Sequence, residues 1–407
     1  MKKFFSAKIF FGVLVLAIFF FAFISVHDNS KSHFNHDDIL NLYINRENGP
    51  IKQNKKPIQE NPDMKYILQW TDSQSVPFVY MGKEREGFTS RNCPYTNCIV
   101  TSDRNRLGDV TKFDVIAFNG NQVRHYSSNM LPAARSPHQK YAFCTIESSH
   151  YYPVCSKQFD NFFNWTWSFR LDSDVRWGYM LIQDKNNSII GPNKIMHWMK
   201  LEDMDPVSEE FKEKLKTKKK AAAWFVSNCY DKAKRGNVAN NLKKELTKYG
   251  LVLDIYGNCG PLKCPSDEVK DCEKMIENDY YFYLSFENSF SEDYVTEKLR
   301  TALNNNAVPI VYGGANYTRF MPDGIYLNAK ETSAAELAAK MDELINNPEK
   351  YANYFRWKNH YSYHSLHDYP ETDEYCRMCA ILNEEKKVKK ISYIQDFRKW
   401  WNNPNYC

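Results

Sequence analysis

Apolar and polar residues alternate in blocks through the second half of the chain. Tyr280 to Phe286 is an apolar run with the length and aromatic content of a buried strand. A polar turn follows, and apolar residues then recur at helical spacing: Val295, Leu299, Ala302 and Leu303. Ala307 to Tyr312 is a second buried-strand run. Strand, helix and strand in this order predict a βαβ unit with parallel strands.

Further strand-like runs extend this pattern over most of the chain. In the first half they are Tyr66–Trp70, Phe113–Phe118 and Tyr141–Ile146, and in the second half Ala221–Val226 and Leu251–Tyr256. Later, Ser333 opens a capping-box pattern for a scaffold helix, with Pro348 marking its end. Two successive α/β halves predict two Rossmann-like domains facing a cleft.

The N-terminus predicts a membrane anchor. Lys2, Lys3 and Lys8 precede an uncharged apolar run over residues 9–26, which is just long enough to cross a bilayer. A cleaved signal peptide is the alternative, although Phe23 and Ile24 stand where small residues are expected. We expect a cytosolic tail at 1–8, a single-pass type II span at 9–26 and a polar, flexible stem at 27–62.

Charge and cysteine content narrow the class of protein. A formal charge of +5 over 407 residues argues against a dedicated nucleic-acid binder. The lysine-rich stretch within Ser208–Lys220 is typical of a solvated helix face. Eleven cysteines indicate disulfides formed in an oxidising compartment. Because the count is odd, at least one thiol is free or pairs between chains. A free cysteine is therefore one candidate point of oligomerisation, and the stem is another.

Polar side chains follow two of the predicted strands, at the strand ends where ligands bind in α/β sheets. Glu147 comes directly after Tyr141–Ile146. Glu297 and Lys298 lie in the first turn of the predicted helix, where free N–H groups and the helix dipole favour anions. A plainer interpretation is that Glu297 caps the helix and that Lys298 is solvated.

Several segments resemble the α1,3-fucosyltransferases, glycosyltransferase family 10. The central one is Phe282–Ser289 followed by Asp293–Lys298 and Val308–Val311. Other matching segments occur in the family's order: Thr145–Ser149, Arg170–Asp174, Trp224–Asn228, Ala315–Phe320 and Cys376–Cys379. The resemblance implies a GT-B-like fold with an acceptor-side domain at 63–207, a nucleotide-sugar domain at 208–365 and a segment at 366–407 that returns to the first domain.

The resemblance also implies a reaction and a set of residue roles. Fucose would pass from GDP-fucose with inversion, and Glu147 would be the general base. The donor-binding residues would be Arg235, Asn288, Tyr294, Glu297 and Lys298. Lys234 is an alternative to Arg235, and core packing and turn formation are alternative roles for Tyr294 and Asn288. Ser149 replaces the proline that the family commonly has here.

The sequence also contains candidate metal, disulfide and glycan sites. Asp172-Ser-Asp174 resembles a DxD metal motif, but basic side chains could neutralise the leaving group, so we expect no metal ligands there and no tightly bound cofactor. Mn²⁺ or Mg²⁺ remain candidate stimulators. By resemblance, Cys376 and Cys379 tie the tail to the first domain through Cys93 or Cys98, with the pairing open. Three sequons could carry N-glycans if exposed: Asn164, Asn186 and Asn316.

The favoured hypothesis is a Golgi membrane enzyme that transfers fucose to a GlcNAc hydroxyl in glycoprotein glycans. The acceptor stays open between the N-glycan core, N-acetyllactosamine and its GalNAc analogue. A membrane-anchored glycan-binding protein on an inactive scaffold and a transferase for another nucleotide sugar are the alternatives. The joint presence of Glu147, Arg235, Glu297 and Lys298 argues against an inactive scaffold.

Overall fold

A computed structural model describes residues 64–264, 269–402 and 406–407. The expected tail, anchor and stem (1–62) lie outside these residues and stay predictions. Within the described ranges, no helix has both the length and the apolar character that a membrane crossing requires.

The first sheet is wholly parallel and has the strand order β2-β1-β3-β4-β5-β6. Its strands are β1 (Lys65–Gln69), β2 (Cys98–Thr101), β3 (Val115–Asn119), β4 (Lys140–Thr145), β5 (Trp165–Ser168) and β6 (Val175–Arg176). Every residue of β3, β4 and β5 is buried, as expected for parallel strands covered on both faces. Two short helices, α3 (Glu86–Thr89) and α4 (Gly120–Val123), lie in its connections.

The second sheet is also parallel, with the order β10-β9-β11-β12-β13. Its strands are β9 (Lys220–Phe225), β10 (Leu253–Tyr256), β11 (Tyr280–Phe286), β12 (Val308–Tyr312) and β13 (Leu327–Asn328). The helices in this part are α5 (Glu209–Lys216), α6 (Arg235–Leu246), α7 (Val269–Asp279), α8 (Glu297–Asn304), α9 (Ala334–Ile345) and α10 (Pro348–Asn353). The βαβ unit predicted from the sequence is therefore β11–α8–β12, and its parallel pairing is confirmed.

Helix boundaries depart from the sequence pattern at two points. Val295 lies before α8 although it matches the apolar spacing of that helix. The capping box at Ser333 is confirmed, but α9 ends at Ile345, and Pro348 is instead the first residue of α10. Proline suits that position because its missing N–H would have no partner in a first helical turn.

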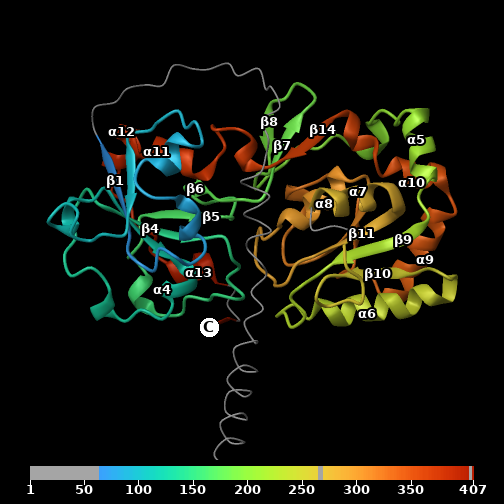
Figure 1. The fold of residues 1–407 in the computed structure, drawn as a ribbon, viewed down its shortest axis with the longest axis horizontal. Helices are drawn as coiled ribbons and strands as arrows, with labels where there is room; N and C mark the ends of the chain where they lie inside the picture. Colours follow the sequence, from blue (N-terminus) through green and yellow to red (C-terminus); the bar gives the residue numbers. More distant parts are fainter. Residues whose placement is uncertain (1–63, 265–268, 403–405) are drawn as a thin grey trace, which may run out of the picture. The chain divides into compact units, whose positions relative to one another are not determined.

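The C-terminal segment packs on the first sheet. Figure 1 shows α11 (Glu374–Leu382), α12 (Glu385–Lys389) and α13 (Phe397–Trp401), in red, among the blue and teal strands. α11 contributes Tyr375, Met378 and Leu382 to the core on one face of that sheet. α13 contributes Phe397 and Trp401 to the core on the other face. A small antiparallel sheet joins β7 (Leu181–Asp184) to β8 (Ile189–Gly191) and to β14 (Tyr361–His364).

Candidate active site

Glu147 lies in the turn directly after β4, where it faces the loop that follows β11. The phenol of Tyr294, from that loop, donates a hydrogen bond to Glu147 Oε2 at 3.3 Å. The backbone N–H of Glu147 donates to the Thr145 hydroxyl at 3.1 Å, which helps to hold the turn. The structure thus brings the expected base and the expected donor loop together, although they are 147 residues apart in the sequence.

The surroundings of Glu147 favour a proton acceptor. Burial raises the pKa of its carboxyl, and Glu297 and Glu287 add to this effect. Lys298 and the Tyr294 hydrogen bond act in the opposite direction, and the net change in pKa is upward. A carboxylate with a raised pKa takes a proton more readily than an ordinary surface glutamate, which is the property that a general base needs.

A second charged group lies at the start of α8. Lys298 Nζ is 2.8 Å from Glu297 Oε1 and 3.4 Å from Glu287 Oε2. Burial opposes the charged form of Lys298, but Glu287 and Glu297 outweigh it, and its pKa is raised. Burial also opposes the charge of Glu297, but Lys298 reverses that effect and lowers its pKa. Lys298 is therefore a cation, and Glu297 an anion, beside Glu147.

Glu287 is a buried acid that the sequence pattern did not single out. Its Oε1 accepts the backbone N–H of Thr296 at 2.8 Å, so it already occupies a donor at the N-terminus of α8. One of the backbone donors at this helix end is therefore already taken by a side chain of the protein. Burial raises the pKa of the Glu287 carboxyl, and its side chain is 2% exposed. The signal in the sequence was its position at the end of β11, the same position that identified Glu147 after β4.

Arg235 and Lys234 occupy different surroundings at the start of α6. Arg235 is 1% exposed, its Nε is 2.9 Å from Asp231 Oδ2, and it donates to the Phe286 carbonyl at 2.8 Å. Lys234 is exposed and has a left-handed backbone, with φ at 53°. A pocket of about 280 Å³ lies here, lined by Cys229, Tyr230, Asp231, Lys234, Gly236 and Asn237. Arg235 thus holds the end of β11 to the start of α6 from within the protein, while Lys234 lines this pocket.

Serine pairs join the turn after β4 to the loop after β11. Ser148 Oγ is 2.6 Å from Ser289 Oγ, and Ser149 Oγ is 2.9 Å from Ser291 Oγ. Asn288, another expected donor-binding residue, is half-buried and accepts from the Ser289 hydroxyl at 2.8 Å. Ser149, which departs from the family's proline, therefore makes a hydrogen bond that proline could not make.

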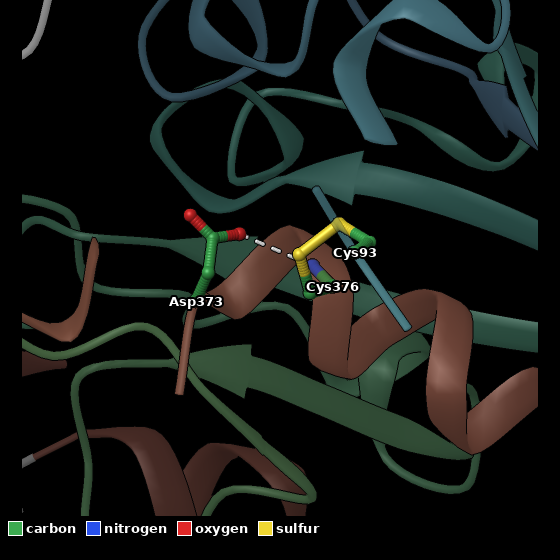
Figure 2. A group of neighbouring side chains, drawn as sticks. All are labelled: Cys93, Asp373 and Cys376. Carbon is green, nitrogen blue, oxygen red and sulfur yellow. Dashed lines mark hydrogen bonds between the residues drawn. A yellow bond between two sulfur atoms is a disulfide. The ribbon is translucent and has the colours of Figure 1, made fainter. Parts of the chain in front are cut away.

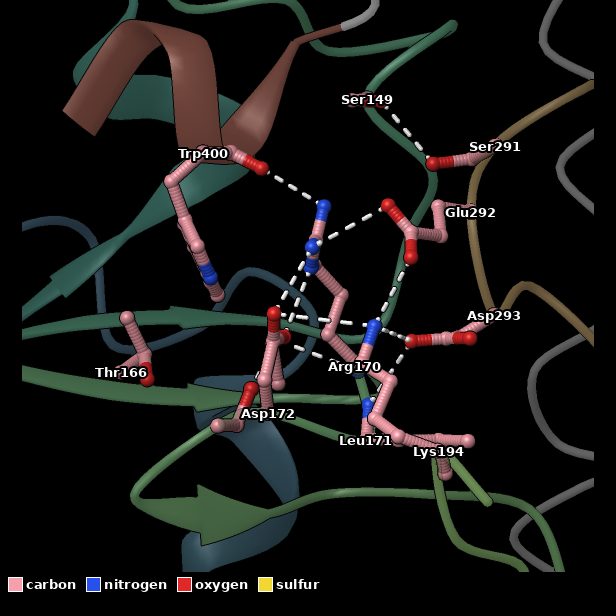
Figure 3. A network of polar contacts seen from close by, with 12 residues as sticks. Ser149, Thr166, Arg170, Leu171, Asp172, Lys194, Ser291, Glu292, Asp293 and Trp400 are labelled. Atoms are coloured by element: carbon pink, nitrogen blue, oxygen red, sulfur yellow. Dashed lines mark hydrogen bonds and ion pairs between the residues drawn. The ribbon is translucent and has the colours of Figure 1, made fainter. Parts of the chain in front are cut away.

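An ion-pair network continues this connection (Figure 3). Asp293 is buried, and its carboxylate is 2.6 Å from Lys194 Nζ, as Figure 3 shows, and 2.6 Å from Arg319 Nη1. Its backbone is left-handed, with φ at 59°. Asp172 of the DxD-like motif pairs with Arg170 at 2.9 Å. Asp174 accepts from the Thr166 backbone and hydroxyl. Both aspartates therefore have partners within the protein.

Asp293→Asn should lower the free energy of unfolding by about 2 kcal/mol, because two cations lose a buried counter-charge. The partly exposed Lys194 and Arg319 can turn toward water, which keeps the loss below that of a fully buried pair. Urea unfolding monitored by fluorescence measures the change. Glu292→Gln is the matched control, because Glu292 contacts the same cations but its side chain is 48% exposed. Equal losses in the two variants would contradict a special role for Asp293.

The cysteines form five disulfides in the described residues. Cys93 pairs with Cys376 and Cys98 with Cys379, which resolves the pairing that the sequence left open. The other three are Cys155–Cys407, Cys229–Cys259 and Cys264–Cys272. The free cysteine is Cys144, which is buried in β4. The expectation that a free cysteine could link two chains is therefore wrong for this fold, because β4 would have to open first.

The three sequons differ in accessibility. Asn164 is 6% exposed, and its side-chain nitrogen donates to the Ser392 carbonyl at 2.7 Å. A glycan at Asn164 is therefore incompatible with this fold, and that expectation is corrected. Asn186 is exposed in the β7–β8 turn. Asn316 is exposed as well, although its side-chain oxygen also accepts the Thr318 N–H.

Comparisons with known proteins agree with the residue-level picture. The model for the fucosyltransferase N-terminal region matches residues 62–180, and that for the glycosyltransferase family 10 (fucosyltransferase) C-terminal region matches 215–400. The chain is 34% identical over 319 residues to alpha-(1,3)-fucosyltransferase C of Drosophila melanogaster, covering 77% of this chain and 71% of that protein.

Two other relatives are similar over a smaller share of their own length. Glycoprotein 3-alpha-L-fucosyltransferase A of Drosophila melanogaster is 30% identical, over 80% of this chain and 58% of its own. Human alpha-(1,3)-fucosyltransferase 4 is 33% identical, over 66% of this chain and 46% of its own. A crystal structure of an alpha1,3-fucosyltransferase superposes with a TM-score of 0.49 at 16% identity, covering 84% of this chain and 95% of that one.

Proposed function

The chain belongs to glycosyltransferase family 10, the fucosyltransferases, and we propose that it is an inverting α1,3-fucosyltransferase acting on glycoprotein glycans. It would move fucose from GDP-β-L-fucose to a hydroxyl of a GlcNAc residue. The observation that carries the proposal is the contact between Glu147, at the end of β4, and Tyr294 of the loop after β11. That contact joins the two matched regions at one group of titratable side chains.

Inversion in a single displacement needs a base on the acceptor side. Glu147 would take the proton of the acceptor hydroxyl as its oxygen attacks the anomeric carbon of fucose. The C–O bond to the diphosphate breaks in the same step, and GDP leaves with the bonding electrons. A carboxylate with a raised pKa suits this role, because the proton that it receives is held more firmly.

The departing diphosphate needs positive charge near it. Lys298 would supply a point charge from α8, and its side chain is 14% exposed, so it is sheltered from water. Arg235 would act with it through the N–H donors that its contacts with Asp231, Phe286 and Asn228 leave. Lys234, which lines the neighbouring pocket, is the alternative partner for phosphate oxygens. Glu297 and Asn288 would contact sugar hydroxyls.

The proposal makes a prediction about pH. Catalysis requires Glu147 in its deprotonated form, so kcat/KM should fall as the pH drops through its raised pKa, at a pH above that of an ordinary glutamate. Tyr294→Phe removes a hydrogen bond that lowers this pKa, and should therefore move the acidic limb to higher pH. Initial rates measured from pH 4 to 9 at saturating GDP-fucose test this. A limb that stays in place in the variant would contradict the assignment.

One assay would identify the acceptor glycan. The full chain is incubated with GDP-fucose and a panel containing N-glycan core, N-acetyllactosamine and GalNAc-containing acceptors, and the product linkage is read by mass spectrometry and NMR. We expect an α1,3 linkage to GlcNAc in at least one acceptor. Binding of glycans without release of GDP would favour the glycan-binding alternative, and transfer from another nucleotide sugar would contradict the donor assignment.

The proposed setting is the Golgi membrane, with the catalytic part in the lumen. The apolar run at 9–26, preceded by lysines, supports a type II anchor. The ten disulfide-bonded cysteines suit an oxidising lumen. Microscopy of the tagged full chain against Golgi and endoplasmic reticulum markers tests this placement.

A further inference from the structure

A buried group of one imidazole and two carboxylates lies at the start of α11, on the first sheet. His367 belongs to the short turn Leu366–Asp368, and Asp373 and Glu374 begin the helix. His367 Nδ1 is 3.1 Å from Asp373 Oδ2 and 3.5 Å from Glu374 Oε2. All three ligand atoms lie within 4.8 Å of one another. The proposed transfer chemistry uses none of these residues.

The start of the helix accounts for only one of the four carboxylate oxygens. Asp373 Oδ1 accepts the backbone N–H groups of Tyr375 and Cys376 at 2.9 and 3.1 Å, as a helix N-cap does. Figure 2 shows this cap beside the Cys93–Cys376 disulfide. The cap fixes the carboxylate and leaves Asp373 Oδ2 directed at His367. Because Cys93 and Cys376 are bonded to each other, they are not available as metal ligands.

Glu374 is the member of the group whose carboxylate makes no hydrogen bond within the described residues. Its side chain is 1% exposed, and neither carboxylate oxygen has a hydrogen-bond partner. Leaving a buried carboxylate without partners costs several kcal/mol, so such groups normally pair or bind a cation. Arg91 Nε lies 3.5 Å from Asp373, and the two terminal nitrogens of Arg91 donate hydrogen bonds to the Gly87 and Tyr80 carbonyls.

A proton and a metal ion would satisfy this group differently. A proton on His367 Nδ1 can make one strong hydrogen bond, and the shorter distance favours Asp373 as its acceptor. Both Glu374 oxygens then have no hydrogen-bond donor. A metal ion would engage all three ligand atoms at once. Ligands held about 2.0–2.2 Å from a tetrahedral Zn²⁺ lie roughly 3.3–3.6 Å apart, close to the two distances from His367.

We propose that His367, Asp373 and Glu374 bind one Zn²⁺ ion that stabilises the junction between α11 and the first sheet. Imidazole nitrogen with carboxylate oxygen suits Zn²⁺ better than Mg²⁺, which prefers oxygen ligands and retained water. The side chain of His367 is 25% exposed, which leaves a route for the ion and for water as a fourth ligand. The ion is structural, and this proposal stands independently of the transferase activity.

The test measures metal content and stability rather than activity. The full chain, purified without chelator, should retain about one Zn²⁺ per molecule in mass spectrometric metal analysis. A chelator should lower the unfolding midpoint, and Zn²⁺ at a hundredfold excess over its Kd should restore about 4 °C that Mg²⁺ does not. Glu374→Gln and His367→Gln should each lose the ion. Glu371→Gln, a neighbouring exposed carboxylate, is the matched control and should retain it.

Two results would overturn the proposal. One is a wild-type chain that retains no zinc and whose midpoint is unmoved by Zn²⁺, which would make the group a hydrogen-bonded triad around a protonated imidazole. The other is zinc that persists in both Glu374→Gln and His367→Gln, which would place the ion elsewhere. The chelator titration uses wild-type protein, so the proposal remains testable even if the variants fold poorly.

Discussion

Glu147→Gln should lower kcat by about 10³-fold, because an amide cannot accept the proton of the acceptor hydroxyl. The change preserves the size of the side chain, and the amide oxygen can still accept the Tyr294 hydrogen bond. Lys298, Glu297 and the pocket at Lys234 are untouched, so the affinity for GDP should change little. Initial rates with GDP-fucose and the best acceptor of the panel, together with GDP titration calorimetry, measure both quantities.

Two controls separate a missing base from a disturbed site. Tyr294→Phe keeps the carboxylate and should retain much of the activity, with its effect concentrated in the pH profile. Glu292→Gln, on the same loop but away from Glu147, should leave kcat within a few fold. Near wild-type turnover by Glu147→Gln would disprove the base assignment. A parallel loss of GDP binding would show instead that Glu147 acts by holding the donor loop.

The sequence predicted β1, β3 and β4 of the first sheet and β9 to β12 of the second, because parallel strands that are buried on both faces read as continuous apolar runs. It did not predict β2, β5, β6 or β13. β11 and β12 fall within a residue of the predicted limits for this reason. Glu147, Glu297 and Lys298 could be singled out by position alone, since ligands gather beyond the carboxyl ends of such strands. Helix ends were less predictable. Val295 matches the apolar spacing of α8 but lies before the helix, and it is apolar because it packs in the core around Met180 and Trp357.

Contacts between distant segments could not be read from local patterns. Asn164 satisfies the sequon rule, yet β5 places its amide against the backbone near Ser392. Arg235 is a residue type that binds phosphate, yet its guanidinium donates to the carbonyl of Phe286, 51 residues later in the chain. The role of Glu287 depends on how α8 meets β11. In each case the deciding partner is selected by the fold, and a spacing rule carries no information about it.

The two disulfides that hold α11 should show strong coupling. Cys93–Cys376 and Cys98–Cys379 run side by side between the same two segments. While one is intact, the other closes a ring of only about ten residues, and its loss should cost about 3 kcal/mol in the chain-entropy model. When both are absent, Cys155–Cys407 is the one disulfide that still links the C-terminal segment to the part of the chain that forms the first sheet. The last bond removed then opens a loop of about 95 residues, worth about 4.6 kcal/mol in the same model.

Replacing all four of these cysteines by alanine should therefore destabilise the chain by about 7 kcal/mol, more than twice the loss from either pair alone. That is comparable to the whole free energy of unfolding of many domains, so we expect the variant to lose α11 packing at 37 °C. Urea unfolding of the two single-pair variants and the combined variant measures the coupling, with Cys264→Ala/Cys272→Ala, a pair eight residues apart, as control. Losses from the two pairs that simply add would contradict the model, because they would mean that each bond stabilises its own surroundings and that neither depends on the other to hold the helix.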